Sequence, residues 1–255
     1  MIPIHDSVRG RTFPYVNVAI IALNFVVFFY ELALSQHQIA PGITRLDTFI
    51  YRWGNIPACM FDALGHATRL NAQGLRTCAD QPQPVLSVFT AMFIHGGWLH
   101  ILGNMLFLWI FGDNVEDAMG HLRYAVFYLL VGVIAAFGQA VVSVNSLTPA
   151  IGASGAIAGV MGAYIVLYPG ATVAVIIPIF FFIPFPLPAF VLIGFWFIAQ
   201  LLSGYTSIGG RAVGASGGIA YFAHIGGFLA GALLVHLFVW GRPRRAPRRR
   251  ADDVW

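Results

Sequence analysis

The chain contains the largely apolar run FPYVNVAIIALNFVVFFYELAL at residues 13–34, in which the first charged side chain is Glu31. About 20 such residues in an α-helix, at ~1.5 Å per residue, cross a hydrocarbon core of roughly 30 Å. The run is too long for the apolar core of a signal peptide, and no small-residue cleavage pattern follows it. We therefore interpret residues 13–34 as the first membrane-spanning helix.

The composition extends this interpretation to the whole chain. Of 255 residues, 58% are hydrophobic and 9% are charged, whereas a soluble domain is about a quarter charged. The sequence predicts an all-α membrane protein whose membrane domain, residues 13–240, has six spans: 13–34, 98–111, 122–144, 153–168, 187–202 and 219–240. Residues 176–188 contain four prolines, which exclude a regular helix and predict an interfacial connection.

The arginines orient the predicted spans. All 14 basic residues are arginine, and six of them lie at positions 242–250, directly after the last span. Such a segment marks the cytoplasmic side and suits anionic membrane lipids, so we do not expect nucleic acid as a partner. Six spans put both ends, residues 1–12 and 241–255, in the cytoplasm and the long loop 35–84 outside. The expected location is the cell (inner) membrane.

The long loop contains the two cysteines, Cys59 and Cys78. A bond between them would close a loop of about 20 residues, for which chain-entropy models give roughly 3 kcal/mol. A loop outside the cell favours a disulfide. The alternative is two free thiols in a flexible loop.

Polar residues gather where the even-numbered spans begin, and all these beginnings lie at the outer surface. His100 and Asn104 are in the first turns of span two, Ser154 opens span four, and His224 lies early in span six. Ionisable and polar groups inside a membrane are costly and mark function more often than not. We therefore expect a site that opens to the extracytoplasmic side.

Ser154 is the candidate nucleophile and His224 its general base. The serine stands at a helix N-terminus, where backbone N–H groups can hold an anion. The alternative is that Ser154 only packs, because a GxxxG pattern that allows close helix contact begins at Gly155. A second pattern of this kind begins at Gly227, so spans four and six can approach closely enough for serine and histidine to meet.

His100 and Asn104 are four residues apart, on one face of a helix. With the Ser154 backbone N–H they are candidate donors to an oxyanion, and the alternative is an interhelical hydrogen bond. Gly152 and His95 are expected to be structural residues near the site, like Gly155 and Gly227.

Two further features concern the choice of reacting groups. A second GASG tetrapeptide contains Ser216, which we expect in a loop or at a helix cap.

The acidic residues Asp113, Glu116 and Asp117 are predicted in a turn after span two, capping it or pairing with Arg123. No carboxylate in a span completes a triad, and no HExxH motif occurs, so we expect a Ser–His dyad without metal or cofactor.

Four motifs occur in order along the chain: HGGWLHILGNM (95–105), FGDNVED (111–117), GASG (152–155) and AHIGG (223–227). Together they resemble the bacterial rhomboid proteases, a resemblance that runs from about residue 85 to 231. It implies a six-helix rhomboid bundle that hydrolyses peptide bonds in or near transmembrane segments of membrane proteins. It also implies the same roles for Ser154, His224, His100 and Asn104, and single-span substrates with a small residue at the cut.

The chain departs from the family pattern in two places. Some members carry a Trp-Arg pair where residues 86–88 read LSV, and some have a tyrosine stacked on the base histidine where Ala158 stands. We expect Phe222 or Tyr221 to hold the ring of His224 instead. The alternative function is a non-catalytic scaffold or transporter that binds client helices; transporters often contain internal repeats, and the sequence contains none.

Overall fold

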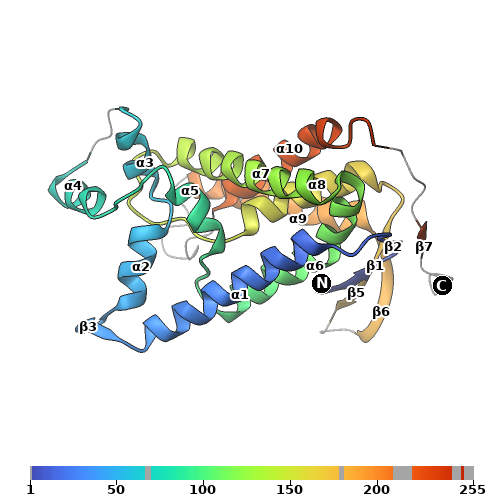
Figure 1. The fold of residues 1–255 in the computed structure, drawn as a ribbon, viewed down its shortest axis with the longest axis horizontal. Helices are drawn as coiled ribbons and strands as arrows, with labels where there is room; N and C mark the ends of the chain where they lie inside the picture. The colour runs from blue at the N-terminus through green and yellow to red at the C-terminus, as the bar shows by residue number, and fades with distance from the viewer. Residues whose placement is uncertain (1, 67–69, 178–180, 209–219, 243–247, 250–255) are drawn as a thin grey trace.

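The computed structural model describes residues 2–66, 70–177, 181–208, 220–242 and 248–249. Six long helices form a bundle in this part of the chain (Figure 1): α1 (Tyr15–Ser35), α6 (Trp98–Met119), α7 (His121–Val142), α8 (Ser154–Leu167), α9 (Ala189–Ile208) and α10 (Tyr221–Phe238). The helices agree with the predicted spans in order and approximate position. The largest differences are at the C-terminal ends of α6 and α9, which continue beyond the predicted limits.

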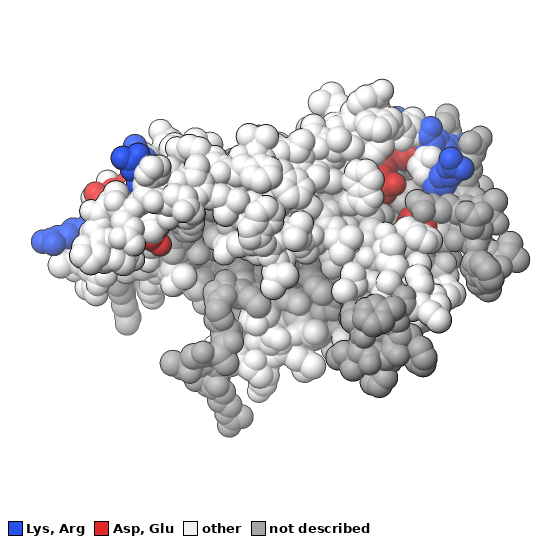
Figure 2. All heavy atoms as spheres, turned by 90° about the horizontal axis from the view of Figure 1, so that it is seen from below, with Lys and Arg blue, Asp and Glu red and all other residues white. Residues whose placement is uncertain are grey.

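The flanks of the bundle are apolar. Among the described residues, α1, α7, α9 and α10 are long and apolar enough to cross a membrane. Helix α6 forms a fifth candidate together with the segment Ser87–Phe93, from which it is bent by 94°. On the face drawn in Figure 2, the visible Arg, Asp and Glu side chains lie at the two ends of the molecule, with an uncharged band between them. The chain is therefore a multi-pass membrane protein.

Helix α8 lies at the centre of the bundle, where α6, α7 and α10 contact it. All its residues from 155 to 164 are buried. A Cβ atom added to Gly231 would lie 1.9 Å from the Gly159 carbonyl oxygen, and one added to Gly227 would lie 2.1 Å from the Gly155 carbonyl oxygen. Because even a methyl group does not fit there, these small residues allow α8 and α10 to pack backbone against backbone.

Short strands flank the helical bundle at the end that holds the N-terminal residues, which we call the terminal end. An antiparallel sheet forms in the order β1 (Ile2–Asp6), β5 (Thr172–Ile177), β6 (Phe181–Pro188). The sequence predicted no helix in 176–188, but it did not predict the hairpin. Proline removes a backbone donor and is tolerated on an edge strand such as β6, where one side of the ladder is unpaired. A second pair, β2 (Val8–Arg9) with β7 (Arg248–Arg249), lies at the same end.

The loop between α1 and α6 has a structure of its own, at what we call the loop end. It contains the hairpin β3 (Gln38–Ala40) and β4 (Ile43–Thr44), followed by α2 (Arg45–Trp53), α3 (Pro57–Ala63), α4 (Ala72–Ala79) and α5 (Ser87–Thr90). A disulfide joins Cys59 in α3 to Cys78 in α4. The loop also pairs with the segment before α8, because Asn55 and Ala150 exchange backbone hydrogen bonds of 3.1 and 2.8 Å.

The acidic residues expected after the second span differ from the prediction. Asp113, Glu116 and Asp117 belong to the last two turns of α6, because this helix continues to Met119. The guanidinium of Arg123 donates to two backbone oxygens at the end of α10, at 3.1 and 2.7 Å. The prediction of a turn at these acidic residues is therefore wrong, because α6 continues past them to Met119.

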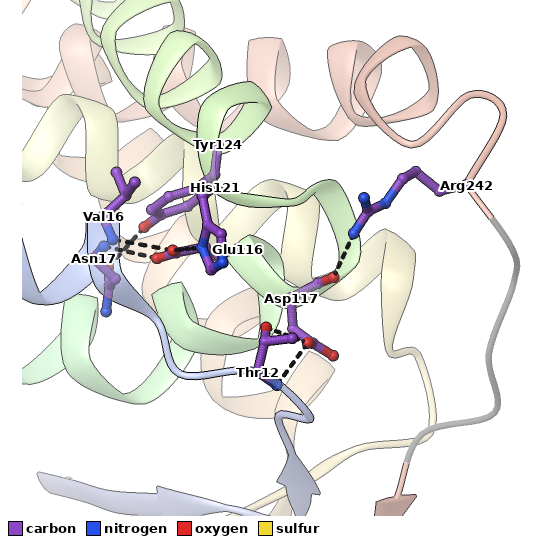
Figure 3. A network of polar contacts seen from close by, with 8 residues as sticks. All are labelled: Thr12, Val16, Asn17, Glu116, Asp117, His121, Tyr124 and Arg242. Carbon is purple, nitrogen blue, oxygen red and sulfur yellow. Dashed lines mark hydrogen bonds and ion pairs between the residues drawn. The ribbon is translucent and has the colours of Figure 1, made fainter.

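Two of these carboxylates, Glu116 and Asp117, hold the start of α1 at the terminal end (Figure 3). Glu116 accepts hydrogen bonds from the backbone N–H groups of Val16 at 3.0 Å and Asn17 at 2.7 Å. Asp117 accepts two more from the backbone and the hydroxyl of Thr12. The first turn of α1 has no side-chain cap of its own, so Glu116 satisfies amides that would otherwise be orphaned. The start of α1 is thus capped by Glu116, which lies about 100 residues later in the sequence.

Candidate active site

Ser154 is the first residue of α8. Two residues earlier, Gly152 has φ +117°, a conformation that glycine adopts much more readily than other residues. The Gly152 N–H donates to the carbonyl oxygen of Ala91 at 2.8 Å. Together with the pairing of Asn55 and Ala150, this bond fixes the approach of the chain to α8. The start of α8 has no side-chain cap, which suits a helix N-terminus that accepts an anion.

His224 lies in the first turn of α10, directly across from Ser154. Its Nε2 atom is 2.7 Å from the Ser154 hydroxyl oxygen. The two residues are 70 positions apart in the sequence and meet because the glycines of α8 and α10 allow the helices to touch. His224 is only 9% exposed and Ser154 is half-buried, so the imidazole is largely shielded from water.

Gln200 on α9 is a partner of His224 that the sequence interpretation missed. The Gln200 Oε1 atom is 2.7 Å from His224 Nδ1, and the Trp196 ring, one turn earlier, has its centroid 5.6 Å from that of His224. Phe222 and Tyr221 were expected in this role, but the ring against His224 in the described part of the chain is Trp196. The Phe222 ring lies beside Gly204 instead, where an added Cβ atom would be 3.4 Å from Phe222 Cζ. A signal was present, since Gln200 is a single amide in the otherwise apolar stretch 189–202.

His100 and Asn104 face the backbone just before Ser154. A Cβ atom added to Gly152 would lie 2.7 Å from His100 Nε2 and 3.7 Å from Asn104 Nδ2. His100 Nδ1 is 3.3 Å from the Gly96 N–H and accepts its hydrogen bond, so Nε2 carries the proton of the neutral ring. Asn104 Nδ2 is buried and has no acceptor among the described residues. Two N–H donors therefore lie beside Gly152, two residues before Ser154.

His95 lies behind this pair and is buried. Its backbone N–H donates to both carboxylate oxygens of Glu31 on α1, at 3.2 and 3.1 Å. Its ring centroid is 5.0 Å from that of His100. The sequence did not suggest the contact with Glu31, and the structural role expected for His95 stays a prediction.

The predicted glycines Gly155 and Gly227 lie at helix contacts beside the site. Gly155 faces α7, since a Cβ atom there would lie 2.7 Å from the Ala135 methyl group, and Gly227 packs on the Gly155 carbonyl group as described above. Ser216 lies outside the described residues. Within the described ranges, no group of three His, Cys, Asp or Glu side chains could hold a metal ion.

This geometry is suited to one kind of chemistry. A serine hydroxyl can pass its proton to an adjacent imidazole and become a nucleophile. Donors aimed at the neighbouring space, where a tetrahedral oxyanion would form, lower the barrier for attack on a carbonyl group. The start of α8 lies toward the loop end of the bundle, where Ala150 pairs with Asn55 of the loop.

Comparisons with known proteins place the chain among related sequences. The family model described as "Rhomboid domain" matches residues 82–241. RHOMBOID-like protein 1 of Arabidopsis thaliana is 30% identical over 164 residues, which cover 61% of this chain and 35% of that protein. Rhomboid protein 1, mitochondrial, of Saccharomyces cerevisiae is 28% identical over 152 residues, which cover 58% and 40%.

A shorter match is closer in sequence. RHOMBOID-like protein 6, mitochondrial, of Arabidopsis thaliana is 40% identical over 78 residues, covering 30% of this chain and 24% of that protein. The matches thus span between about a quarter and two fifths of the lengths of these relatives. These relatives are from a plant and a yeast, so they do not support the specifically bacterial affinity that the motifs suggested.

Proposed function

Because the chain belongs to the Rhomboid family, we propose that it is an intramembrane serine protease that cuts membrane proteins in or near their transmembrane segments. The observation that carries this proposal is the 2.7 Å contact between the Ser154 hydroxyl and His224 Nε2. A serine that serves only in packing does not need an imidazole at hydrogen-bond distance, and a buried imidazole is costly unless its polar atoms are paired.

The proposed reaction begins when a substrate helix unwinds locally and exposes a carbonyl group above Ser154. His224 takes the hydroxyl proton, and the serine oxygen attacks the carbonyl carbon. The oxyanion accepts hydrogen bonds from His100, Asn104 and the Ser154 backbone N–H. His224 then gives its proton to the leaving amine, and water, activated in the same way, hydrolyses the acyl-enzyme. Single-span proteins with a small residue at the cut are the proposed substrates.

Covalent labelling tests the proposal. Purified protein treated with a fluorophosphonate probe is expected to carry one adduct, which mass spectrometry maps to Ser154. Ser154→Ala should lose the adduct and the cleavage of a model transmembrane substrate, whereas Ser216→Ala should keep both. Unlabelled wild-type protein that still binds client helices would instead favour the non-catalytic scaffold. Labelling at Ser216 would show that Ser216, and not Ser154, is the nucleophile.

The membrane topology is a second part of the proposal. All six long helices would cross the membrane, α8 with its 14 residues reaching only about 21 Å. Both termini would face the cytoplasm and the loop end would lie outside, in a cell or inner membrane. The disulfide between Cys59 and Cys78 supports this orientation, because such bonds persist in oxidising compartments.

Thiol accessibility measures this orientation. Spheroplasts that express the protein are treated with a membrane-impermeant reductant and then with an impermeant maleimide. Cys59 and Cys78 should be labelled without permeabilisation, and only after reduction. Labelling that requires lysis would reverse the topology, and labelling without reductant would show that the thiols are not bonded in cells.

A further inference from the structure

The position of the proton on His224 is decided by what its second nitrogen contacts. Nε2 must be unprotonated to accept the Ser154 proton, so the neutral ring must carry its hydrogen on Nδ1. That N–H is buried with the rest of the side chain, which is 9% exposed, and a buried donor without an acceptor costs about 1–3 kcal/mol. A base in this place therefore needs an acceptor at Nδ1.

The acceptor in this structure is an amide. Gln200 Oε1 lies 2.7 Å from Nδ1, while Nε2 lies 2.7 Å from the Ser154 hydroxyl. The amide oxygen can only accept, so this contact selects the tautomer in which Nε2 is the base. The Trp196 ring on the same helix contacts the imidazole at a tilt of 38°, which limits rotation of the ring about its bond to Cβ.

We propose that Gln200 is the positioning residue of the dyad: it holds the Nδ1 proton of His224 and thereby keeps Nε2 directed at Ser154. This inference rests on the proposed protease function. Gln200 contacts Nδ1 of His224, whereas the Ser154 oxygen contacts Nε2, so Gln200 acts through His224. The arrangement is a serine–histidine–amide relay in which three helices, α8, α10 and α9, each supply one member.

Because Gln200, the third residue of the relay, is uncharged, its effect on the reaction rate should be limited. A carboxylate in this place both orients the ring and stabilises the imidazolium that forms during attack. Gln200 orients the ring but supplies no charge. We therefore expect its removal to cost less, about ten- to a hundredfold, and a carboxylate at this position to change the pH dependence.

The test uses Ser154 labelling by the fluorophosphonate probe, measured as a second-order rate across pH. Gln200→Leu should lower the rate about ten- to a hundredfold. It should also lower the unfolding temperature modestly, because the buried Nδ1 N–H of His224 loses its acceptor. Gln200→Glu should keep the rate within about tenfold of wild type. It should also move the acidic midpoint upward by about one pH unit, because a nearby carboxylate favours the protonated ring. The matched control is Thr206→Ala on α9, whose hydroxyl donates only to the Ser203 carbonyl group and whose loss should change neither value.

The outcomes separate this inference from the function on which it rests. If wild-type protein is not labelled at Ser154, the protease proposal and the positioning role are both overturned. If wild type is labelled and Gln200→Leu keeps its rate and pH profile, only the positioning role is overturned. Should Gln200→Leu fail to fold, Gln200→Glu decides, since an unchanged midpoint would mean that residue 200 does not contact the base.

Discussion

Replacing Gly231 with valine is expected to separate α8 from α10 and to abolish labelling of Ser154. The new Cβ atom would lie 1.9 Å from the Gly159 carbonyl oxygen and 2.6 Å from its Cα atom. Both neighbours are backbone atoms, so no rotamer change can relieve the overlap and the helices must move apart. Overpacking in a tight core costs about 1–3 kcal/mol or more. Gly231 is two helical turns beyond His224, so the displaced helix carries the base away from Ser154.

Thermal unfolding in detergent measures the loss of helix packing, and probe labelling measures the loss of reactivity at Ser154. Gly231→Val should lower the unfolding temperature by several degrees, and Gly231→Ala should give a smaller change of the same sign. The matched control is Gly194→Val on α9, where an added Cβ meets nothing within 4 Å. Wild-type stability and labelling in Gly231→Val would mean that α8 and α10 are not in backbone contact, and the site geometry would then lose its basis.

The helices could be predicted because the membrane imposes a simple rule on the sequence. A segment that crosses lipid must be apolar over most of its length and must satisfy its backbone internally, so long apolar runs predict helices. The glycine spacing after Gly155 and Gly227 predicted the contact between α8 and α10 for a similarly local reason. Only small residues allow such an approach, and the pattern is visible within one turn of helix.

Contacts made by side chains across the fold could not be predicted in this way. Glu116 accepts hydrogen bonds from the start of α1, about 100 residues away, and nothing near it in the sequence indicates that partner. The hairpin β5–β6 was missed because its prolines exclude a helix but do not exclude an edge strand. Gln200 was missed because an amide in a span can face any neighbouring helix, and the sequence does not give the rotation of α9.

Asn104→Ala is expected to reduce cleavage of a model transmembrane substrate about a hundredfold to a thousandfold. The loss should appear in kcat with little change in KM, because an oxyanion exists only in the transition state and the intermediates near it. The folded state should be nearly as stable as wild type, since Asn104 Nδ2 is buried without an acceptor among the described residues. If Asn104 instead held two helices together by this donor, its loss would lower the unfolding temperature and kcat together.

Gly152→Ala tests the same proposed oxyanion site by filling it instead of removing a donor. The methyl group of Gly152→Ala would lie 2.7 Å from His100 Nε2, so it would fill the place that a substrate oxygen needs while leaving both donors present. The φ of +117° at this position adds strain for any residue with a Cβ atom. The control is Leu99→Ala on α6, because this side chain is 90% exposed. If Asn104→Ala and Gly152→Ala both cleave at the wild-type rate, the oxyanion does not lie between α6 and Gly152, and its donors must be sought elsewhere around Ser154.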